Sequence, residues 1–168
     1  MIKIFDNFLD AKEYEEINHF ILSDNFPWYC TDGKVNAMDN LIGMTHTFYL
    51  DNNILSNYYK HLFPIILKCN MQAIRRIKAN LDLKSFNIKT TLHTDYTTYL
   101  EEQWTGIYYV NSNNGKTFFE NGDEIESVAN RMIVFPANTP HGTIFQTDIN
   151  KRVLINFNWY GGNTSKDI

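Results

Sequence analysis

Four residues in the second half of the chain have the types and spacing of a metal site beside a bound acid. His93 and Asp95 stand two positions apart, His141 follows after a long interval, and Arg152 comes eleven residues after His141. Two imidazoles and one carboxylate on a single face of a metal ion are the ligands expected for a non-haem Fe(II) oxygenase with open coordination positions. The Arg side chain adds a permanently charged fork that binds a carboxylate. The set therefore predicts a site for one ferrous ion and one oxoacid.

The spacing of His93 and Asp95 has a geometric meaning if their segment is extended. Residues two apart on a β-strand point to the same face, and the sequence predicts a strand over 88–95. Both side chains then reach one ion from one rigid element. The third ligand must come from elsewhere in the chain, and His141, which stands between a proline and a glycine, is the candidate.

A second predicted strand, over 152–159, places Arg152 in the interior. Two sets of residues alternate along this strand. The apolar set is Val153, Ile155, Phe157 and Trp159, and the largely polar set is Arg152, Leu154, Asn156 and Asn158. We expect the apolar face to pack against N-terminal helices and the polar face to line a ligand cavity, because unpaired polar groups are costly in a core. Arg152 has no carboxylate close to it in the sequence, so we expect an incoming oxoacid to pair with it.

The elements that must hold these residues divide the chain into a mixed first part and a strand-rich remainder. Asp10 and Glu13 have the spacing of a capping box for a helix over 11–22. A second helical region is expected over 54–74, divided at Pro64. The predicted strands span 44–50, 76–81, 88–95, 106–110, 116–120, 123–128, 131–135, 142–146 and 152–159.

Turn residues separate these strands. Asn121-Gly122 is a strong hairpin signal, and the Asn-Asn-Gly run at 113–115 predicts another tight reversal. Many short strands at regular spacing indicate a sandwich or barrel, and a cupin-type jelly roll places ligands from distant strands in one mouth. The predicted fold is mainly β with N-terminal helices, a double-stranded β-helix (jelly-roll/cupin-like). We expect one domain over 1–168, with helical support over roughly 1–75 and the jelly-roll core over roughly 76–160.

Composition restricts the class of protein. With 168 residues, 43% hydrophobic and 15% aromatic, the chain can bury a substantial core. The net charge is -4 and no basic stripe is present, so the footprint of a non-specific nucleic-acid binder is missing. Cys30 and Cys69 lie outside any CxxC spacing, which favours a reduced, cytoplasmic protein. The chain starts without a signal-peptide pattern and has no apolar run approaching ~18 residues, so no membrane span is expected.

The stretch 92–159 resembles the 2-oxoglutarate- and Fe(II)-dependent dioxygenases, specifically the prolyl 4-hydroxylase-like branch. The matching segments are Leu-His-Thr-Asp at 92–95, Ile-Tyr-Tyr-Val-Asn at 107–111, Asn-Arg-Met-Ile-Val-Phe-Pro at 130–136, Pro-His-Gly-Thr at 140–143 and Arg-Val-Leu-Ile-Asn-Phe-Asn-Trp at 152–159. Short stand-alone chains of this kind look similar to phage-encoded members. Many relatives have a Gly-Gly pair where this chain has Asn114-Gly115, a departure that bears on the substrate.

The resemblance implies a hydroxylase that uses Fe(II), 2-oxoglutarate and O2, and it allows ascorbate. The implied metal ligands and catalytic residues are His93, Asp95 and His141. Arg152 is implied as the anchor of the distal carboxylate of 2-oxoglutarate, and Tyr109 as a hydrogen-bond partner of the same group. A further cosubstrate contact is implied on the strand before the His-x-Asp pair, at Asn80.

By analogy, the first substrate to consider is a peptidyl proline, and a small molecule is the other class. No nucleic-acid or membrane partner is expected, and the sequence carries no signal for the oligomeric state. We expect the acidic loop 100–103 to lie over the site. Two alternatives stay open. One is a cupin-type metalloenzyme that does not use 2-oxoglutarate, such as an isomerase or a zinc or manganese hydrolase. The other is a non-enzymatic jelly-roll module that binds sugars or belongs to a virion surface.

Overall fold

Strands make up most of the ordered elements of the chain. The computed structural model describes residues 1–35, 41–86, 88–96 and 102–162. The elements in chain order are β1 (Lys3–Phe5), α1 (Ala11–Leu22), β2 (Tyr29–Asp32), β3 (Ile42–Leu50), β4 (Asn53–Ile54), the 3-10 helix η1 (Asn57–Leu62), α2 (Phe63–Lys68), β5 (Ala73–Leu83), β6 (Gln103–Tyr109), β7 (Asn113–Phe119), β8 (Glu124–Ser127), β9 (Arg131–Pro136), β10 (His141–Ile144) and β11 (Lys151–Tyr160). The predicted mainly β class is confirmed.

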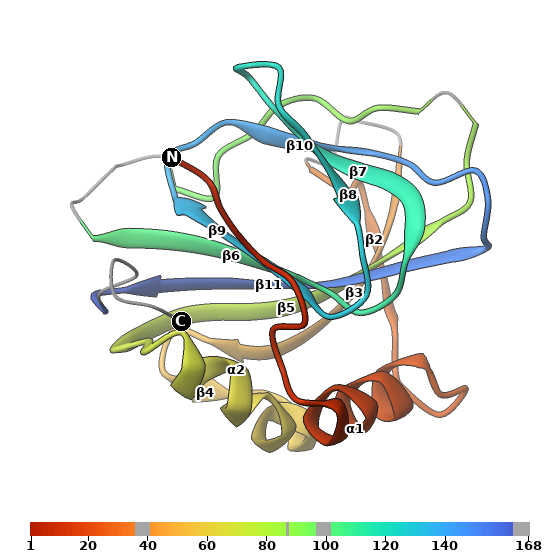
Figure 1. Cartoon of the computed structure of the whole chain (residues 1–168). Coiled ribbons are helices and arrows are strands. Elements are labelled where there is room, and N and C mark those ends of the chain that lie inside the picture. Colours follow the sequence, from red (N-terminus) through yellow and green to blue (C-terminus); the bar gives the residue numbers. More distant parts are fainter. Residues whose placement is uncertain (36–40, 87, 97–101, 163–168) are drawn as a thin grey trace.

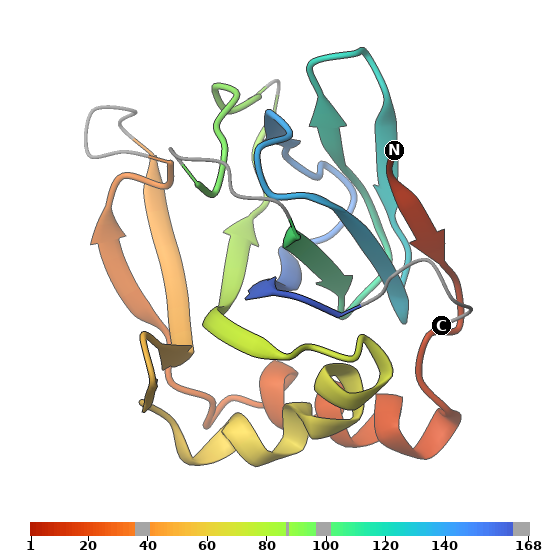
Figure 2. The same ribbon diagram turned by 90° about the vertical axis from the view of Figure 1, so that its left-hand side faces the viewer.

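The strands form two antiparallel sheets. The large sheet has the order β1-β9-β6-β11-β5-β3-β2, with β4 paired to β3, and the small sheet has the order β10-β7-β8. Helices α1 and α2 lie along one face of the large sheet, and the small sheet lies over the opposite face (Figures 1 and 2). Strands β5 and β11, which carry most of the polar residues discussed below, are neighbours in the middle of the large sheet.

The main apolar cluster joins the helices to the large sheet. Ile17 and Ile21 of α1 and Leu62 and Ile65 of the η1–α2 segment are buried in the same cluster as the apolar face of β11. That face consists of Val153, Ile155, Phe157 and Trp159. The predicted packing of this strand face against the N-terminal helices is therefore confirmed, and it turns the other face of β11 toward the small sheet.

Helix α1 has the bounds and the cap that the sequence predicts. The Asp10 carboxylate accepts a hydrogen bond from the Glu13 amide at 2.9 Å, and the Glu13 carboxylate accepts one from the Asp10 amide at 3.4 Å. This reciprocal pair satisfies amides that have no partner inside the helix.

The second helical region is shorter than predicted. Helix α2 ends at Lys68, and Asn70 has a left-handed φ of 49°, which stops the helix. From Ala73 the chain instead joins the large sheet, where β5 pairs with both β11 and β3. Two sets of cross-strand hydrogen bonds outweigh the helical pattern of this stretch.

Two other local predictions are wrong. The segment 88–95 is not a regular strand, because it makes only isolated bridges at Lys89 and His93. The run 113–115 does not reverse the chain; it starts β7, where the pairing with β8 shifts register. The Asn113 side chain accepts from the Gly115 amide and so satisfies the backbone at this bulge. The reversal at Asn121-Gly122 is present, with Gly122 at φ 92°. None of the described helices is long and apolar enough to span a bilayer.

Candidate metal centre

The backbone holds the two predicted histidine ligands opposite each other. His141 is the first residue of β10, and His93 forms an isolated antiparallel bridge with it. The His93 amide donates to the His141 carbonyl oxygen at 3.0 Å, and the His141 amide donates to the His93 carbonyl oxygen at 2.9 Å. The ring centroids are 4.6 Å apart. The two imidazoles therefore converge because their residues are directly paired, not because His93 belongs to a long strand.

Asp95 is fixed by three neighbours from the large sheet. One carboxylate oxygen accepts from the Arg76 guanidinium at 2.9 Å. The other accepts from the Thr105 hydroxyl and from the Asn158 side-chain amide, each at 2.9 Å. Arg76 lies opposite Asn158 in the β5–β11 pairing, so both partners come from the polar face of these strands. Hydrogen bonds of this kind orient a ligating carboxylate before any ion binds.

The protonation states of the cluster suit metal ligation. Burial, the neighbouring His141 ring and the charge of Arg76 lower the pKa of His93 to about 4 despite the opposing effect of Asp95, so that its imidazole is neutral at pH 7. Burial raises the pKa of Asp95, but Arg76, His141 and the hydrogen bonds from Asn158 and Thr105 more than offset this and hold it below its ordinary value. A neutral imidazole and an ionised carboxylate are the forms that bind a metal ion.

The structure brings the three predicted ligands into one cluster. Ligand atoms of His93, Asp95 and His141 all lie within 4.8 Å of one another. Nδ1 of His141 is 3.0 Å from the carbonyl oxygen of Thr139, so this nitrogen is assigned as the N–H donor and Nε2 keeps its lone pair. Nδ1 of His93 is buried and has no hydrogen-bond partner in the part of the chain that the structure describes. The donor types and this orphaned nitrogen fit a single divalent ion.

A cavity opens beside the cluster, between the two sheets. Its volume is about 220 Å³. Besides the three candidate ligands, its walls include Lys34, Arg76, Lys78, Asn80, Ile107, Thr117, Thr143, Leu154 and Asn156. The predicted role of the polar face of β11 as a cavity wall is therefore confirmed at Asn156. Burial is the first cause that lowers the pKa of Lys78, and the charge of Arg76 adds to it while Asp95 opposes it.

Arg152 points inward as predicted, but it already has a carboxylate partner. Its side chain is fully buried, and Nη1 lies 2.8 Å from Oδ2 of Asp82. Asp82 stands opposite Arg152 in the β5–β11 pairing and also forms an ion pair with Lys34. The expectation that only an incoming acid pairs with Arg152 is wrong, because Asp82, distant in sequence, is its direct cross-strand neighbour. The role of Arg152 toward a cosubstrate stays a prediction. The guanidinium also donates to Ser127 at 2.8 Å.

Tyr109 lies next to Arg152 and reaches the cavity wall through Thr117. Its hydroxyl donates to Oγ1 of Thr117 at 2.7 Å, and Nη2 of Arg152 donates to the same atom at 3.4 Å. The Arg152 guanidinium carbon is 5.7 Å from the centroid of the Tyr109 ring. Thr117 lines the cavity, so this hydroxyl connects the two predicted cosubstrate residues to the open space.

Asn80 lines the cavity from the central strand β5. Its side-chain nitrogen donates to Oδ1 of Asn156 at 3.4 Å. The positions on either side of it on the same strand face, Lys78 and Asp82, are among the residues that the sequence reasoning missed. The alternation along β5 could have revealed them. Its polar positions are Arg76, Lys78, Asn80 and Asp82, and the buried apolar positions between them are Ile77, Ala79 and Leu81. Part of the predicted loop 100–103 lies outside the described residues, so its position over the site stays a prediction.

Comparisons with known proteins connect the chain to others through its fold only. No protein-family model matches the chain, and no curated protein is significantly similar to it in sequence. Among solved structures, an oxidoreductase of the 2OG-Fe(II) oxygenase family from Burkholderia pseudomallei matches with a TM-score of 0.66 and 12% identity, over 99% of this chain and 88% of that chain.

Two further solved structures with a similar fold are a hydroxylase and an alpha ketoglutarate dependent enzyme. A prolyl hydroxylase from Trichoplax adhaerens, in complex with a peptide of the hypoxia inducible factor oxygen degradation domain, matches with a TM-score of 0.66 and 16% identity, over 95% of this chain and 83% of that chain. The alpha ketoglutarate dependent carbocyclase SnoK from nogalamycin biosynthesis matches with a TM-score of 0.68 and 9% identity, over 95% and 79%. The chain therefore has the fold of the 2OG-Fe(II) oxygenases.

Proposed function

We propose that the chain is a 2-oxoglutarate- and Fe(II)-dependent oxygenase, and that it is a hydroxylase. The single observation that carries the proposal is the convergence of His93, Asp95 and His141 within 4.8 Å in a fold of this class. In the same proposal, the two facing sheets are the walls of a double-stranded β-helix, and the chain is one dioxygenase domain. Fold likeness alone does not fix a reaction; the ligand cluster is what favours this one.

His93, Asp95 and His141 hold the ferrous ion in this proposal. With 2-oxoglutarate and O2, the ion supplies an oxidation in which one oxygen atom enters a substrate C–H bond and the other enters succinate, with loss of CO2. The chain contributes position and electrostatics. Arg76, Thr105 and Asn158 hold the Asp95 carboxylate in place, and Thr139 fixes the tautomer of His141.

The far end of the cavity supports a diacid cosubstrate through its charge. Asp82 contacts two cations, Lys34 and Arg152, and Lys34 and Thr117 line the cavity. We propose that the distal carboxylate of 2-oxoglutarate binds there, next to Thr117. Tyr109 and Arg152 would bind it directly or through the Thr117 hydroxyl, to which both donate. Asn80 is the proposed additional contact from β5.

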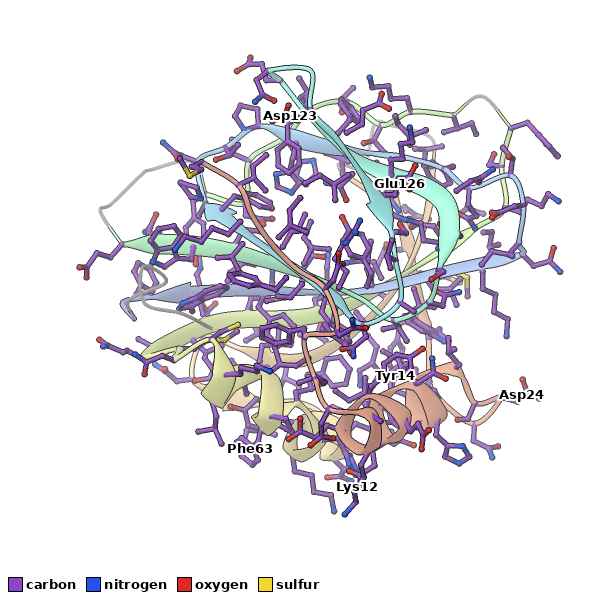
Figure 3. All side chains as sticks on the ribbon, viewed as in Figure 1. Lys12, Tyr14, Asp24, Phe63, Asp123 and Glu126 are labelled. Atoms are coloured by element: carbon purple, nitrogen blue, oxygen red, sulfur yellow. The ribbon has the colours of Figure 1, made fainter. Side chains whose placement is uncertain are left out.

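The test is iron- and 2-oxoglutarate-dependent succinate formation by protein purified without air. The wild type should bind one ferrous ion and release succinate slowly even without substrate. Asp95→Ala should lose both iron binding and succinate release. Asp123 is an exposed acid at the tip of the β7–β8 hairpin (Figure 3), and Asp123→Ala should keep both properties. Succinate formation by Asp95→Ala at the wild-type rate would refute the metal assignment. A peptidyl proline is the reference substrate, because one fold neighbour is a prolyl hydroxylase with a bound peptide.

A second candidate function is a metalloenzyme on the same fold that does not use 2-oxoglutarate. The Asp82–Arg152 ion pair favours it, because the guanidinium is already neutralised. In that case the protein would still bind a divalent metal ion at His93, Asp95 and His141. 2-Oxoglutarate would neither raise the melting temperature of the protein nor be consumed by it.

A further inference from the structure

Lys78 is a cation in the wall of the metal cavity without a counter-charge of its own. It lies on β5 between Arg76 and Asn80 in the alternation that faces the cavity, and its side chain is half-buried. The two other cations in the wall have carboxylate partners, since Arg76 contacts Asp95 and Lys34 contacts Asp82. Within the described part of the chain, the Lys78 ammonium has neither an ion pair nor a hydrogen bond, although its backbone is paired in the sheet. An ammonium group in a partly buried cavity is costly unless an anion joins it.

Side-chain amides complete a polar pocket around Lys78. Asn156 is directly opposite Lys78 in the β5–β11 pairing, and both line the cavity. Asn156 accepts from Asn80 through Oδ1, which turns its Nδ2 donor away from that bond. No acceptor for this Nδ2 occurs among the described residues. An ammonium and an unused amide N–H on adjacent strands are the donors that bind a carboxylate.

The proposed cosubstrate does not need this pocket. In the proposed function, the keto-acid end of 2-oxoglutarate would bind at the metal held by His93, Asp95 and His141, and its distal carboxylate at the Lys34–Asp82–Arg152 cluster. Lys78 is therefore the cation left over when the diacid is accounted for. The cavity volume of about 220 Å³ is also below the ~300–1,000 Å³ of typical small-molecule pockets, so little room remains for a bulky chain beside a diacid.

We propose that Lys78 and Asn156 bind the carboxylate of the oxidised substrate, and that this substrate is a small free organic acid, such as a free amino acid. The inference rests on the proposed function, because it assumes that 2-oxoglutarate occupies the other end of the cavity. It separates this chain from a hydroxylase of internal peptidyl residues, whose carboxyl groups are amides. Lys78 is a specificity residue in this assignment, since it contacts the substrate away from the reacting C–H bond.

The first experiment compares acids with their neutral amides in the succinate assay. Free amino acids, including proline, and small carboxylic acids should raise succinate release above the substrate-free rate. The matched primary amides and a prolyl peptide with an amidated C-terminus should not. In Lys78→Met, the KM for the stimulating acid should rise by at least about tenfold, because a charged hydrogen bond is lost. Its substrate-free succinate release and its KM for 2-oxoglutarate should stay at wild-type values, and Lys78→Arg should recover part of the stimulation.

A control and a direct binding measurement make the outcome decisive even if no acid in the panel is a substrate. Lys12→Met removes an equal charge from the exposed face of α1, on the helical side of the molecule (Figure 3), and should behave as wild type. With Zn(II) and saturating 2-oxoglutarate bound, trifluoroacetate should show saturable binding by fluorine NMR, and trifluoroacetamide should not. Lys78→Met should abolish that binding.

The results separate the two proposals. If the wild type releases no succinate from 2-oxoglutarate in the absence of substrate, the proposed function is overturned. Normal release combined with equal response to acids and amides, or with trifluoroacetate binding that Lys78→Met leaves intact, would overturn the carboxylate site alone. A raised KM for 2-oxoglutarate in Lys78→Met would assign this pocket to the cosubstrate instead and would also overturn the inference.

Discussion

Arg152 and Asp82 face each other across the antiparallel pair β11 and β5, and the closest guanidinium nitrogen and carboxylate oxygen are 2.8 Å apart. Both side chains are almost completely buried, and Lys34 contacts the same carboxylate. The pair stands where the sequence predicts a bare guanidinium. It makes the anchor for the proposed diacid a three-residue cluster of Lys34, Asp82 and Arg152 rather than a single arginine.

The first prediction concerns Asp82→Asn. Removing one partner of a buried ion pair leaves an uncompensated charge, and the free energy of unfolding should fall by about 3–5 kcal/mol. Urea unfolding measures this loss. Because 2-oxoglutarate supplies a replacement carboxylate, it should raise the melting temperature of Asp82→Asn more than that of the wild type. An equal rise in both proteins would argue against cosubstrate binding at Arg152.

The second prediction concerns Arg152→Met. The loss of a charge-assisted hydrogen bond is worth about 1.5–3 kcal/mol, so KM for 2-oxoglutarate should rise by roughly 10- to 150-fold. The turnover number should change much less, because this contact is present in the ground state and in the transition state alike. Steady-state kinetics on folded protein test it. A large fall in turnover number with an unchanged KM would place Arg152 outside the cosubstrate site.

The third prediction concerns the residues that orient Asp95. Asn158→Ala removes a 2.9 Å hydrogen bond to its carboxylate and should weaken Fe(II) binding by about 10- to 100-fold. Anaerobic titration with Fe(II) gives the affinity. Asn156→Ala is the matched control, because Asn156 lies two positions away on the same strand face and does not contact Asp95. Equal loss in both variants would mean that the effect is structural rather than specific to the ligand.

The fourth prediction separates the two thiols. Cys69 is buried, and burial raises the pKa of its thiol to about 12, whereas Cys30 is exposed. At pH 8 a disulfide reagent should modify Cys30 quickly in the native protein and Cys69 only after unfolding, since the thiolate is the reacting form and Cys69 is buried. Cys30→Ser should abolish the fast reaction. Fast modification of Cys69 in that variant would contradict the packing of α2 on the sheet.

The fifth prediction concerns pH and His46. Burial lowers the pKa of His46 below its ordinary value of 6.5, and the hydrogen bond to the Pro27 carbonyl only partly opposes this. Below pH 6.5 the unfolded chain therefore binds more protons than the folded chain, so stability falls as the solution is acidified. Unfolding free energies of chelator-treated protein at pH 7.5 and 5.5 should differ less for His46→Gln than for the wild type. The exposed His19→Gln should keep the wild-type difference.

Local patterns in the sequence predict several elements correctly because short-range forces decide them. The capping box of Asp10 and Glu13 fixes the start of α1, and the alternation over 152–159 fixes which face of β11 meets the helices. The Asn121-Gly122 turn needs a residue that tolerates positive φ, and Gly122 supplies it. The same kind of evidence fails at 113–115, where an Asn-Gly turn signal lies inside a bulged strand.

The sequence by itself determined the types of the candidate ligands, their order along the chain and the inward direction of Arg152, because residue chemistry and strand alternation are local properties. The tertiary structure decided which residues meet. The bridge between His93 and His141, the three partners of Asp95, and the pairing of Asp82 with Arg152 all join segments that are distant along the chain. Cross-strand register sets those contacts, and a shift of one residue in β5 against β11 would turn Lys78 out of the cavity and Asp82 away from Arg152.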